Sequence, residues 1–248
     1  QLFLCDFCQY DYYSIVEYLS KDPEVNINMI KETKLVYEST DIMHNEVYNI
    51  ENIISKPPFY AALENGNLAI VKLLLNNPNT DLNLPFKMEM HKRSFATGNL
   101  KPKDEEDYEM KIIEETPLCL AIRKNEIEYV QLLVASNKIN VNLPYYETYK
   151  LVKDDGEIEY GTKEIPPLHL ALQNNHLDIA KFLITNSTVN FHLVDGEGKK
   201  AFQCTENEEL KSLLQQKASI PSSEIERVVT PITGDPQLFN SYCAKLGL

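Results

Sequence analysis

The sequence predicts a mainly α fold: a solenoid of helix-turn-helix units with long β-hairpin insertions between the repeats. Two observations carry this prediction. Three stretches, at 57–84, 116–143 and 166–193, align with one another without gaps. The segments between them alternate in character, which is typical of strands. Because so short a unit cannot bury its apolar face alone, such units stack, and stacking produces an extended surface rather than a pocket.

The first helix of each unit opens with proline and continues with apolar residues at helical spacing. In the first stretch these residues are Phe59, Ala62 and Leu63. Proline suits this position because the N–H groups of the first turn have no helical partner. The matching positions of the other two units hold Leu118, Ala121, Ile122, Leu168, Ala171 and Leu172.

A polar break separates the two helices of each unit and carries Gly66, Asn125 or Asn175. We expect a left-handed backbone there, since glycine and asparagine adopt it at the lowest cost. The second helix follows with apolar residues at a period of about 3.6. These are Leu68, Val71, Leu74 and Leu75, then Ile127, Val130, Leu133 and Val134, then Leu177, Ala180, Leu183 and Ile184.

These motifs resemble the ankyrin repeat, whose core reads T-P-L-H-x-A, followed by a Gly-His break and an I-V-x-x-L-L helix. The resemblance is clearest at 116–118, 167–171 and 69–75. It implies stacked helix pairs, a concave surface along the first helices, and a hairpin finger projecting between units.

The chain departs from the family pattern at the residues that join neighbouring units. Pro57 and Pro166 replace the family's threonine, and Tyr60 and Cys119 replace its histidine. Because that threonine and histidine help to tie units together in the family, the resemblance implies that these joints depend more on apolar packing here.

Weaker copies flank the three strong repeats. A capping unit is predicted at 1–28, with helices at Leu2–Gln9 and Ser14–Leu19, and a C-terminal cap at 195–215, with a helix at Glu208–Leu214. Terminal units are expected to be atypical because one of their faces meets water. The solenoid is therefore predicted to span residues 1–215.

Three insertions, at 29–56, 85–115 and 144–165, separate the units more widely than the family's spacing of about 33 residues. In the third, Tyr149–Lys153 and Glu157–Tyr160 alternate around Asp154-Asp155-Gly156, and Asp-Gly is a strong hairpin turn signal. If all three insertions are hairpins, adjacent fingers pair edge to edge into one sheet along the solenoid. Residues of types favoured at binding surfaces would then decorate it: Tyr37, Tyr48, Met88, Met90, Tyr108, Met110, Tyr146, Tyr149 and Tyr160.

The net charge limits which kinds of molecule the chain could bind, and the cysteine content indicates its cellular compartment. The formal net charge of −13 and the pI near 4.9 disfavour nucleic acid and anionic membrane surfaces, and are compatible with a basic protein partner. No apolar run reaches the roughly 18–20 residues of a membrane helix. Five cysteines without a disulfide framework indicate a reduced, cytoplasmic protein, and we interpret Cys5 and Cys8 as small core residues.

Sequence signatures of catalysis are missing. There is no Gly-rich phosphate loop, H-E-x-x-H or G-x-S-x-G motif, and no paired cysteine ligand set. We therefore expect no enzyme activity, no cofactor and no metal site.

The segment 216–248 is predicted to be a linker and tail with a short helix at 236–246. That helix could dock on the last unit, occupy the groove, or lead into a further domain.

The sequence thus predicts a protein-binding scaffold or adaptor that uses its concave groove and its fingers. The groove residues implied by the resemblance are Glu64, Asn65, Arg123, Lys124, Gln173 and Asn174, and the finger residues are Tyr149, Asp154, Asp155 and Tyr160. Two other functions stay open: a regulatory or targeting segment of a larger enzyme or channel protein, and a self-assembling structural element. A monomer is favoured.

Overall fold

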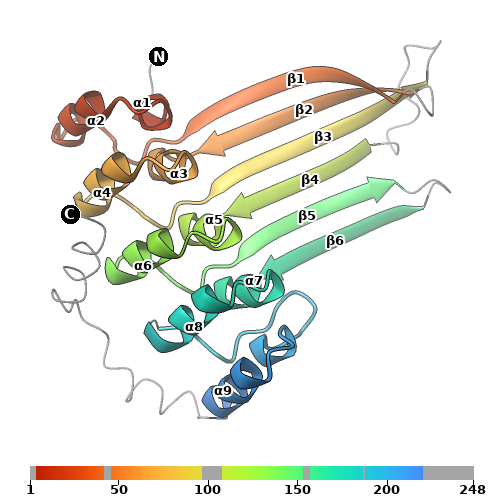
Figure 1. Cartoon of the computed structure of the whole chain (residues 1–248). Coiled ribbons are helices and arrows are strands. Elements are labelled where there is room, and N and C mark those ends of the chain that lie inside the picture. Colours follow the sequence, from red (N-terminus) through yellow and green to blue (C-terminus); the bar gives the residue numbers. More distant parts are fainter. Residues whose placement is uncertain (1–3, 42–45, 97–107, 153–156, 187, 220–248) are drawn as a thin grey trace.

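The computed structural model describes residues 4–41, 46–96, 108–152, 157–186 and 188–219. Pairs of helices stack along one side of the molecule, and a sheet projects sideways from them (Figure 1). The predicted tail helix and the Asp154-Asp155-Gly156 turn lie outside the described residues. The helices are α1 (Leu4–Gln9), α2 (Tyr13–Ser20), α3 (Pro58–Glu64), α4 (Leu68–Asn76), α5 (Pro117–Arg123), α6 (Ile127–Ala135), α7 (Pro167–Gln173), α8 (Leu177–Asn186), the 3₁₀ turn η1 (Ala201–Gln203) and α9 (Glu208–Ala218).

The break between the paired helices has the same backbone in all three strong repeats. Gly66, Asn125 and Asn175 have φ values of 69°, 58° and 57°, which confirms the predicted left-handed conformation. The residue after each break donates its N–H back to the first helix. These bonds run from Asn67 to the Ala62 carbonyl (3.0 Å), from Glu126 to that of Ala121 (2.9 Å) and from His176 to that of Ala171 (2.9 Å). The break therefore closes the first helix and starts the second.

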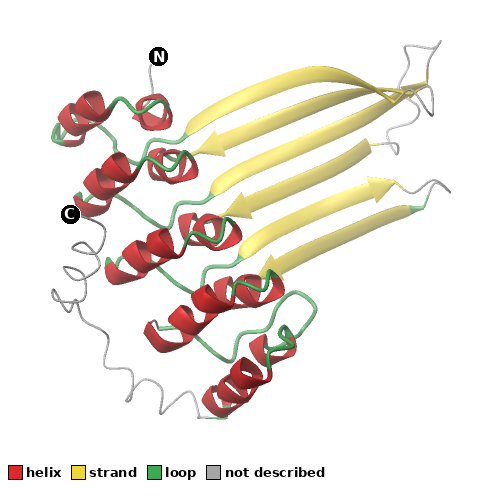
Figure 2. Cartoon of the chain, viewed as in Figure 1, coloured by secondary structure: helices red, strands yellow, loops and turns green. Residues whose placement is uncertain are grey.

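The core lies between two layers of helices. The first helices α1, α3, α5 and α7 stand beside the sheet, and α2, α4, α6 and α8 stand behind them (Figure 2). The apolar stripes identified in the sequence are buried here, among them Leu63, Leu74, Ile122, Leu133 and Leu183. Full burial of such a side chain stabilises the fold by about 1.5–3 kcal/mol.

The two end units differ from the strong repeats. In α1, Cys5 and Cys8 are buried free thiols, which confirms the interpretation that they are core residues; burial raises their pKa values to about 11 and about 12. At the other end Leu210 and Leu214 anchor α9, which continues to Ala218, beyond the predicted helix. The first unit also exposes a group of large side chains: Tyr10, Tyr12, Tyr13, Ile15 and Tyr18.

Each insertion forms a hairpin, and the three hairpins join into one antiparallel sheet in the order β1-β2-β3-β4-β5-β6. The sheet that the sequence predicted conditionally is thus present. A β layer runs beside the repeats, so "mainly α" describes only the helical half of the molecule. The strands are β1 (Lys31–Asp41), β2 (Glu46–Lys56), β3 (Phe86–Ala96), β4 (Tyr108–Glu115), β5 (Tyr145–Val152) and β6 (Ile158–Ile165).

Asparagines at the end of each unit connect it to the next. The Nδ2 groups of Asn28, Asn83 and Asn142 donate to the carbonyls of Asn79, Lys138 and Thr188 at 2.8, 2.9 and 3.2 Å. Their Oδ1 atoms accept the N–H groups of Asp81, Asn140 and Asn190 at 2.9, 2.7 and 2.8 Å. We call these three residues the asparagine ladder.

None of the described helices is long and apolar enough to cross a membrane.

Candidate protein-binding surface

The sheet has two faces, and one of them adjoins the first helices. Phe86 of β3 stacks on Tyr60 of α3, with ring centroids 4.9 Å apart. Lys56 of β2 pairs with Glu64 of α3 at 2.6 Å, and Glu115 of β4 pairs with Arg123 of α5 at 2.7 Å. Because directly opposed residues of antiparallel strands share a face, the register carries this assignment across the sheet. We call this side the helix-side face and the opposite side the far face.

Apolar and aromatic side chains gather on the helix-side face. Each of these side chains is half-buried or exposed. Their spread over six strands makes a broad surface rather than a single pocket. They are Leu35, Tyr37, Ile50, Ile54, Met88, Met90, Ile113, Tyr145, Tyr149, Leu151 and Ile165. Of these, Tyr145 and Ile165 also pack against the helical core.

The charges of the strands divide unequally between the two faces. Among strand residues with described side chains, the helix-side face carries Lys31, Lys56, Lys92, Lys111 and Lys163 against Glu109, Glu115, Glu147 and Glu159. The far face carries Lys34, Lys87 and Lys150 against Glu32, Glu38, Glu51, Glu89, Glu114 and Glu164. The acidity of the sheet is therefore concentrated on the far face, and the helix-side face is nearly balanced.

Glu147 is the centre of charge pairing on the helix-side face. Lys111 and Lys163 approach its carboxylate at 3.1 Å from the strands on either side. Desolvation by burial alone would raise the pKa of Glu147, but hydrogen bonds from Tyr145, Lys111 and Lys163 lower it below its ordinary value. These contacts hold three neighbouring strands in register.

A cavity of about 260 Å³ lies on the far face, lined by Ile112, Glu114, Tyr146 and Thr148. It is open to solvent and lies between β4 and β5. No cluster of three or more His, Cys, Asp or Glu suited to a metal ion occurs in the part of the chain that the structure describes.

The predicted groove residue Arg123 belongs to a joint between two units. The Tyr60 hydroxyl donates to Glu115 Oε2 at 2.6 Å, and Arg123 bonds both oxygens of the same buried carboxylate, Nε to Oε1 at 2.7 Å and Nη2 to Oε2 at 3.0 Å. Burial, and then the Glu115 charge, raise the pKa of Tyr60. Tyr60 stands where the family has histidine, so this joint is polar as well as apolar.

Glu64 and Lys124 are also engaged within the chain. Glu64 accepts from Lys56 at 2.6 Å, and Lys124 Nζ donates to the Glu64 carbonyl at 2.5 Å. These contacts link α3 to the strand before it and to the following unit. Asn65, next to Glu64, is exposed and donates to the Ala61 carbonyl at 2.8 Å.

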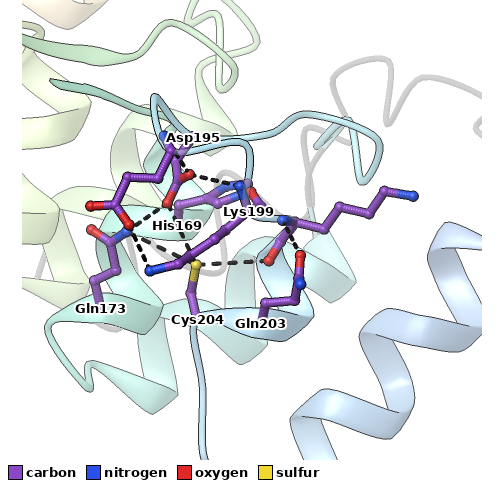
Figure 3. Close-up of polar contacts among 8 residues, drawn as sticks. His169, Gln173, Asp195, Lys199, Gln203 and Cys204 are labelled. Atoms are coloured by element: carbon purple, nitrogen blue, oxygen red, sulfur yellow. Dashed lines mark hydrogen bonds and ion pairs between the residues drawn. The ribbon is translucent and has the colours of Figure 1, made fainter. Parts of the chain in front are cut away.

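Gln173 joins the last strong repeat to the C-terminal cap (Figure 3). Its Nε2 donates to Asp195 Oδ2 at 3.1 Å, and Asp195 Oδ1 accepts the N–H groups of Glu197 and Lys199 at 3.0 and 2.9 Å. The Nε2 atom of His169 lies 3.1 Å from the Lys199 carbonyl. Gln173 is thus a joint residue although it is exposed, as is its neighbour Asn174.

The two predicted finger tyrosines lie on opposite faces. Tyr149 is on the helix-side face, opposite Gly161, with Lys163 Nζ 5.7 Å from its ring centroid. Tyr160 is opposite Lys150 on the far face and is 70% exposed. Asp154 and Asp155 lie outside the described residues. Of the decorating residues, Tyr37, Met88 and Met90 share the face of Tyr149, whereas Met110 and Tyr146 share that of Tyr160.

Sequence reasoning missed the aliphatic part of the helix-side face, which includes Leu35, Ile50, Ile54 and Ile113. The alternation within each strand was the available signal. It shows which residues of one strand share a face, but the register between strands is needed to combine six strands into one surface.

A family model described as ankyrin repeats (3 copies) matches residues 4–195. No curated protein matches the chain.

Proposed function

Because the chain belongs to the ankyrin repeat family, whose repeats are in general non-catalytic protein–protein interaction modules, we propose that it is a scaffold or adaptor that binds a protein partner on the helix-side face. The observation that carries the proposal is the collection of partly exposed apolar and aromatic side chains on that face of the six-stranded sheet. Tyrosine and methionine suit such a surface because they are amphipathic or adaptable.

The polar contacts of the predicted groove residues favour the strands over the groove as the main binding surface. Arg123, Lys124 and Gln173 are used in joints between units, so a partner that took them would leave those joints unsatisfied. We therefore assign the main contacts to the strands, with Asn65 and Asn174 at the border of the surface.

The physical basis of binding is preorganisation. The asparagine ladder and the Glu115 and Glu147 ion pairs hold the side chains in fixed relative positions before a partner arrives. Less conformational entropy is then lost on binding, so many weak contacts add up to useful affinity.

The charge balance of the helix-side face bears on the chemistry of the partner. Lysines and glutamates nearly balance there and pair with one another, so this face does not attract a basic partner in the way that the net charge of −13 suggests. We propose a partner segment with apolar side chains between charges of both signs.

The described cysteines are free, which supports the cytoplasmic location that we propose.

The test compares two matched double variants of the fingers. Ile50→Ser with Met90→Ser changes the helix-side face of β2 and β3, and Ile53→Ser with Met110→Ser makes the same chemical change on the far face of β2 and β4. Each variant and the wild type would capture partners from cell lysate, and the captured protein would then be purified and its Kd measured.

We expect the helix-side variant to weaken the purified complex about tenfold or more, a loss of roughly 1.4 kcal/mol or more, and the far-face variant to bind like the wild type. Equal weakening by both variants, or weakening by the far-face variant alone, contradicts the proposal. Circular dichroism of both variants would show that each is folded.

A further inference from the structure

The first strand of the sheet has an open edge. β1 is 11 residues long and stands at the end of the strand order, so β2 is its only neighbour among the described strands. Its register with β2 runs from Lys31 to Asp41 without a bulge, and it contains no proline. Leu35, Val36 and Tyr37 in its centre are 46%, 56% and 47% exposed.

Proteins usually protect such an edge with bulges, prolines or a covering loop, because its free N–H and C=O groups are a template for another strand. The opposite edge shows such protection, since Gly196 of a following loop donates its N–H to the Glu164 carbonyl of β6 at 2.7 Å. The difference makes β1 the edge on which a further strand can be added.

The sequence of β1 is complementary to itself when read in opposite directions. Consider two copies of β1 that pair antiparallel about a two-fold axis at Val36, the middle residue of the strand. A residue that precedes Val36 in one copy is then opposite the residue that follows Val36 by the same number of positions in the other copy. Lys34 then faces the partner's Glu38, and Leu35 faces the partner's Tyr37. All 11 residues take part.

Neighbouring two-fold registers lose this complementarity. An axis at Leu35 places Glu32 opposite the partner's Glu38, and an axis at Lys34 places two lysines opposite each other. An axis at Tyr37 leaves Lys34 and Glu38 opposite uncharged residues. Opposite charges in directly opposed positions stabilise a strand pair, whereas like charges destabilise it.

We propose that β1 pairs with β1 of a second copy of this chain, antiparallel and with its two-fold axis at Val36. The contact is isologous, so it closes as a dimer rather than growing into a filament. Because opposed residues share a face, the helix-side face of one copy continues into that of the other. This dimer replaces the monomer that the sequence favoured, and it does not depend on the partner-binding proposal.

Lys34 already has a partner in its own chain. Its ammonium lies 2.8 Å from Glu51 on the far face, and its side chain is 58% exposed. The partner's Glu38 would approach on this same face, so Lys34 can contact both carboxylates without crossing the sheet.

The first test is a cross-link at the axis in the full 248-residue chain. Val36→Cys places two thiols opposite each other, at the separation of directly opposed side chains, which is close to that of a disulfide. The control is Tyr160→Cys on the other edge, and the wild type controls for the native thiols. We expect mild oxidation to give a covalent dimer with Val36→Cys and not with either control.

The second test exchanges the charges. Lys34→Glu and Glu38→Lys each place like charges opposite each other twice per dimer, so we expect each to weaken self-association about tenfold in sedimentation experiments. A mixture of the two variants restores both opposite pairs, and we expect the mixed dimer to associate as tightly as the wild type. Both sites are exposed, so thermal unfolding should show that each variant stays folded, with Lys34→Glu slightly less stable because it loses its ion pair with Glu51.

Three results would overturn the proposal. One is a wild-type chain that stays monomeric in light scattering at high micromolar concentration. Another is equal cross-linking of Val36→Cys and Tyr160→Cys. The third is a mixture of the two charge variants that associates no better than either variant alone. That result would mean that the dimer contact lies elsewhere on the chain, or that β1 pairs with a different protein.

Discussion

Tyr60, Glu115 and Arg123 show how one departure from the family pattern is accommodated at the residue scale. Tyr60 and Glu115 are 55 residues apart and both are buried, so the carboxylate needs hydrogen bonds to offset its lost hydration. The tyrosine hydroxyl and the Arg123 guanidinium supply three. Because burial keeps the Tyr60 hydroxyl protonated, it remains a donor throughout the neutral range.

We predict that Tyr60→Phe lowers the free energy of unfolding by about 1–3 kcal/mol, since a buried charged acceptor loses one donor while the ring and its stacking on Phe86 remain. Urea denaturation measures this change. The control is Tyr146→Phe, which removes a hydrogen bond to Glu164 in an exposed position and should cost less than about 0.5 kcal/mol. Equal costs for the two variants would refute the role given to burial.

At the scale of the element, the third hairpin contains a close contact between its two strands. Tyr149 of β5 lies over Gly161 of β6, and a Cβ atom added at Gly161 would overlap the Tyr149 ring. The same ring contacts Lys163, and its hydroxyl donates to Glu159 at 3.2 Å. Gly161 thus leaves the space in which this tyrosine packs against the sheet.

We predict that Gly161→Ala lowers the free energy of unfolding by about 1–3 kcal/mol, because the Tyr149 ring must leave its position. In a Tyr149→Ala background the same substitution should be nearly neutral or favourable, because alanine is less costly than glycine in a strand. A double-mutant cycle gives the coupling. Additive effects would show that the overlap with Tyr149 is not the cause.

At the scale of the whole molecule, the asparagine ladder makes the stack of units continuous. Each ladder residue accepts and donates one hydrogen bond across a unit boundary, and the equivalent position of the last strong repeat holds His192. In a solenoid, stability is the sum of unit and boundary terms, so the boundary contacts determine whether the units unfold together.

We predict that Asn83→Ala lowers the free energy of unfolding by about 1–2 kcal/mol and broadens the denaturant transition, because the boundary between the first and second strong repeats is weakened. The control is Asn190→Ala, which removes a local bond to the His192 N–H at 3.0 Å and leaves the boundary bonds of the ladder in place. A loss of stability without broadening would indicate that the ladder does not couple the units.

The helical half of this protein could be read from its sequence because its signals are local. The proline at the first turn, the left-handed break at Gly66, Asn125 and Asn175, and the 3.6-residue period each act over a few residues, and repetition removes ambiguity. The existence of the hairpins followed from the same kind of signal. The share of sheet in the fold was underestimated, because the pairing of separate fingers is not a local property.

The tertiary structure alone decided the candidate site. A shift of one residue in strand register moves every side chain to the other face, so the separation of Tyr149 from Tyr160 could not be inferred from either strand by itself. Likewise, the engagement of Arg123 with Glu115 depends on the stacking of units. The sequence by itself determined the stacked helix pairs and their fingers; the long-range pairing of strands and units decided which side chains remain available to a partner.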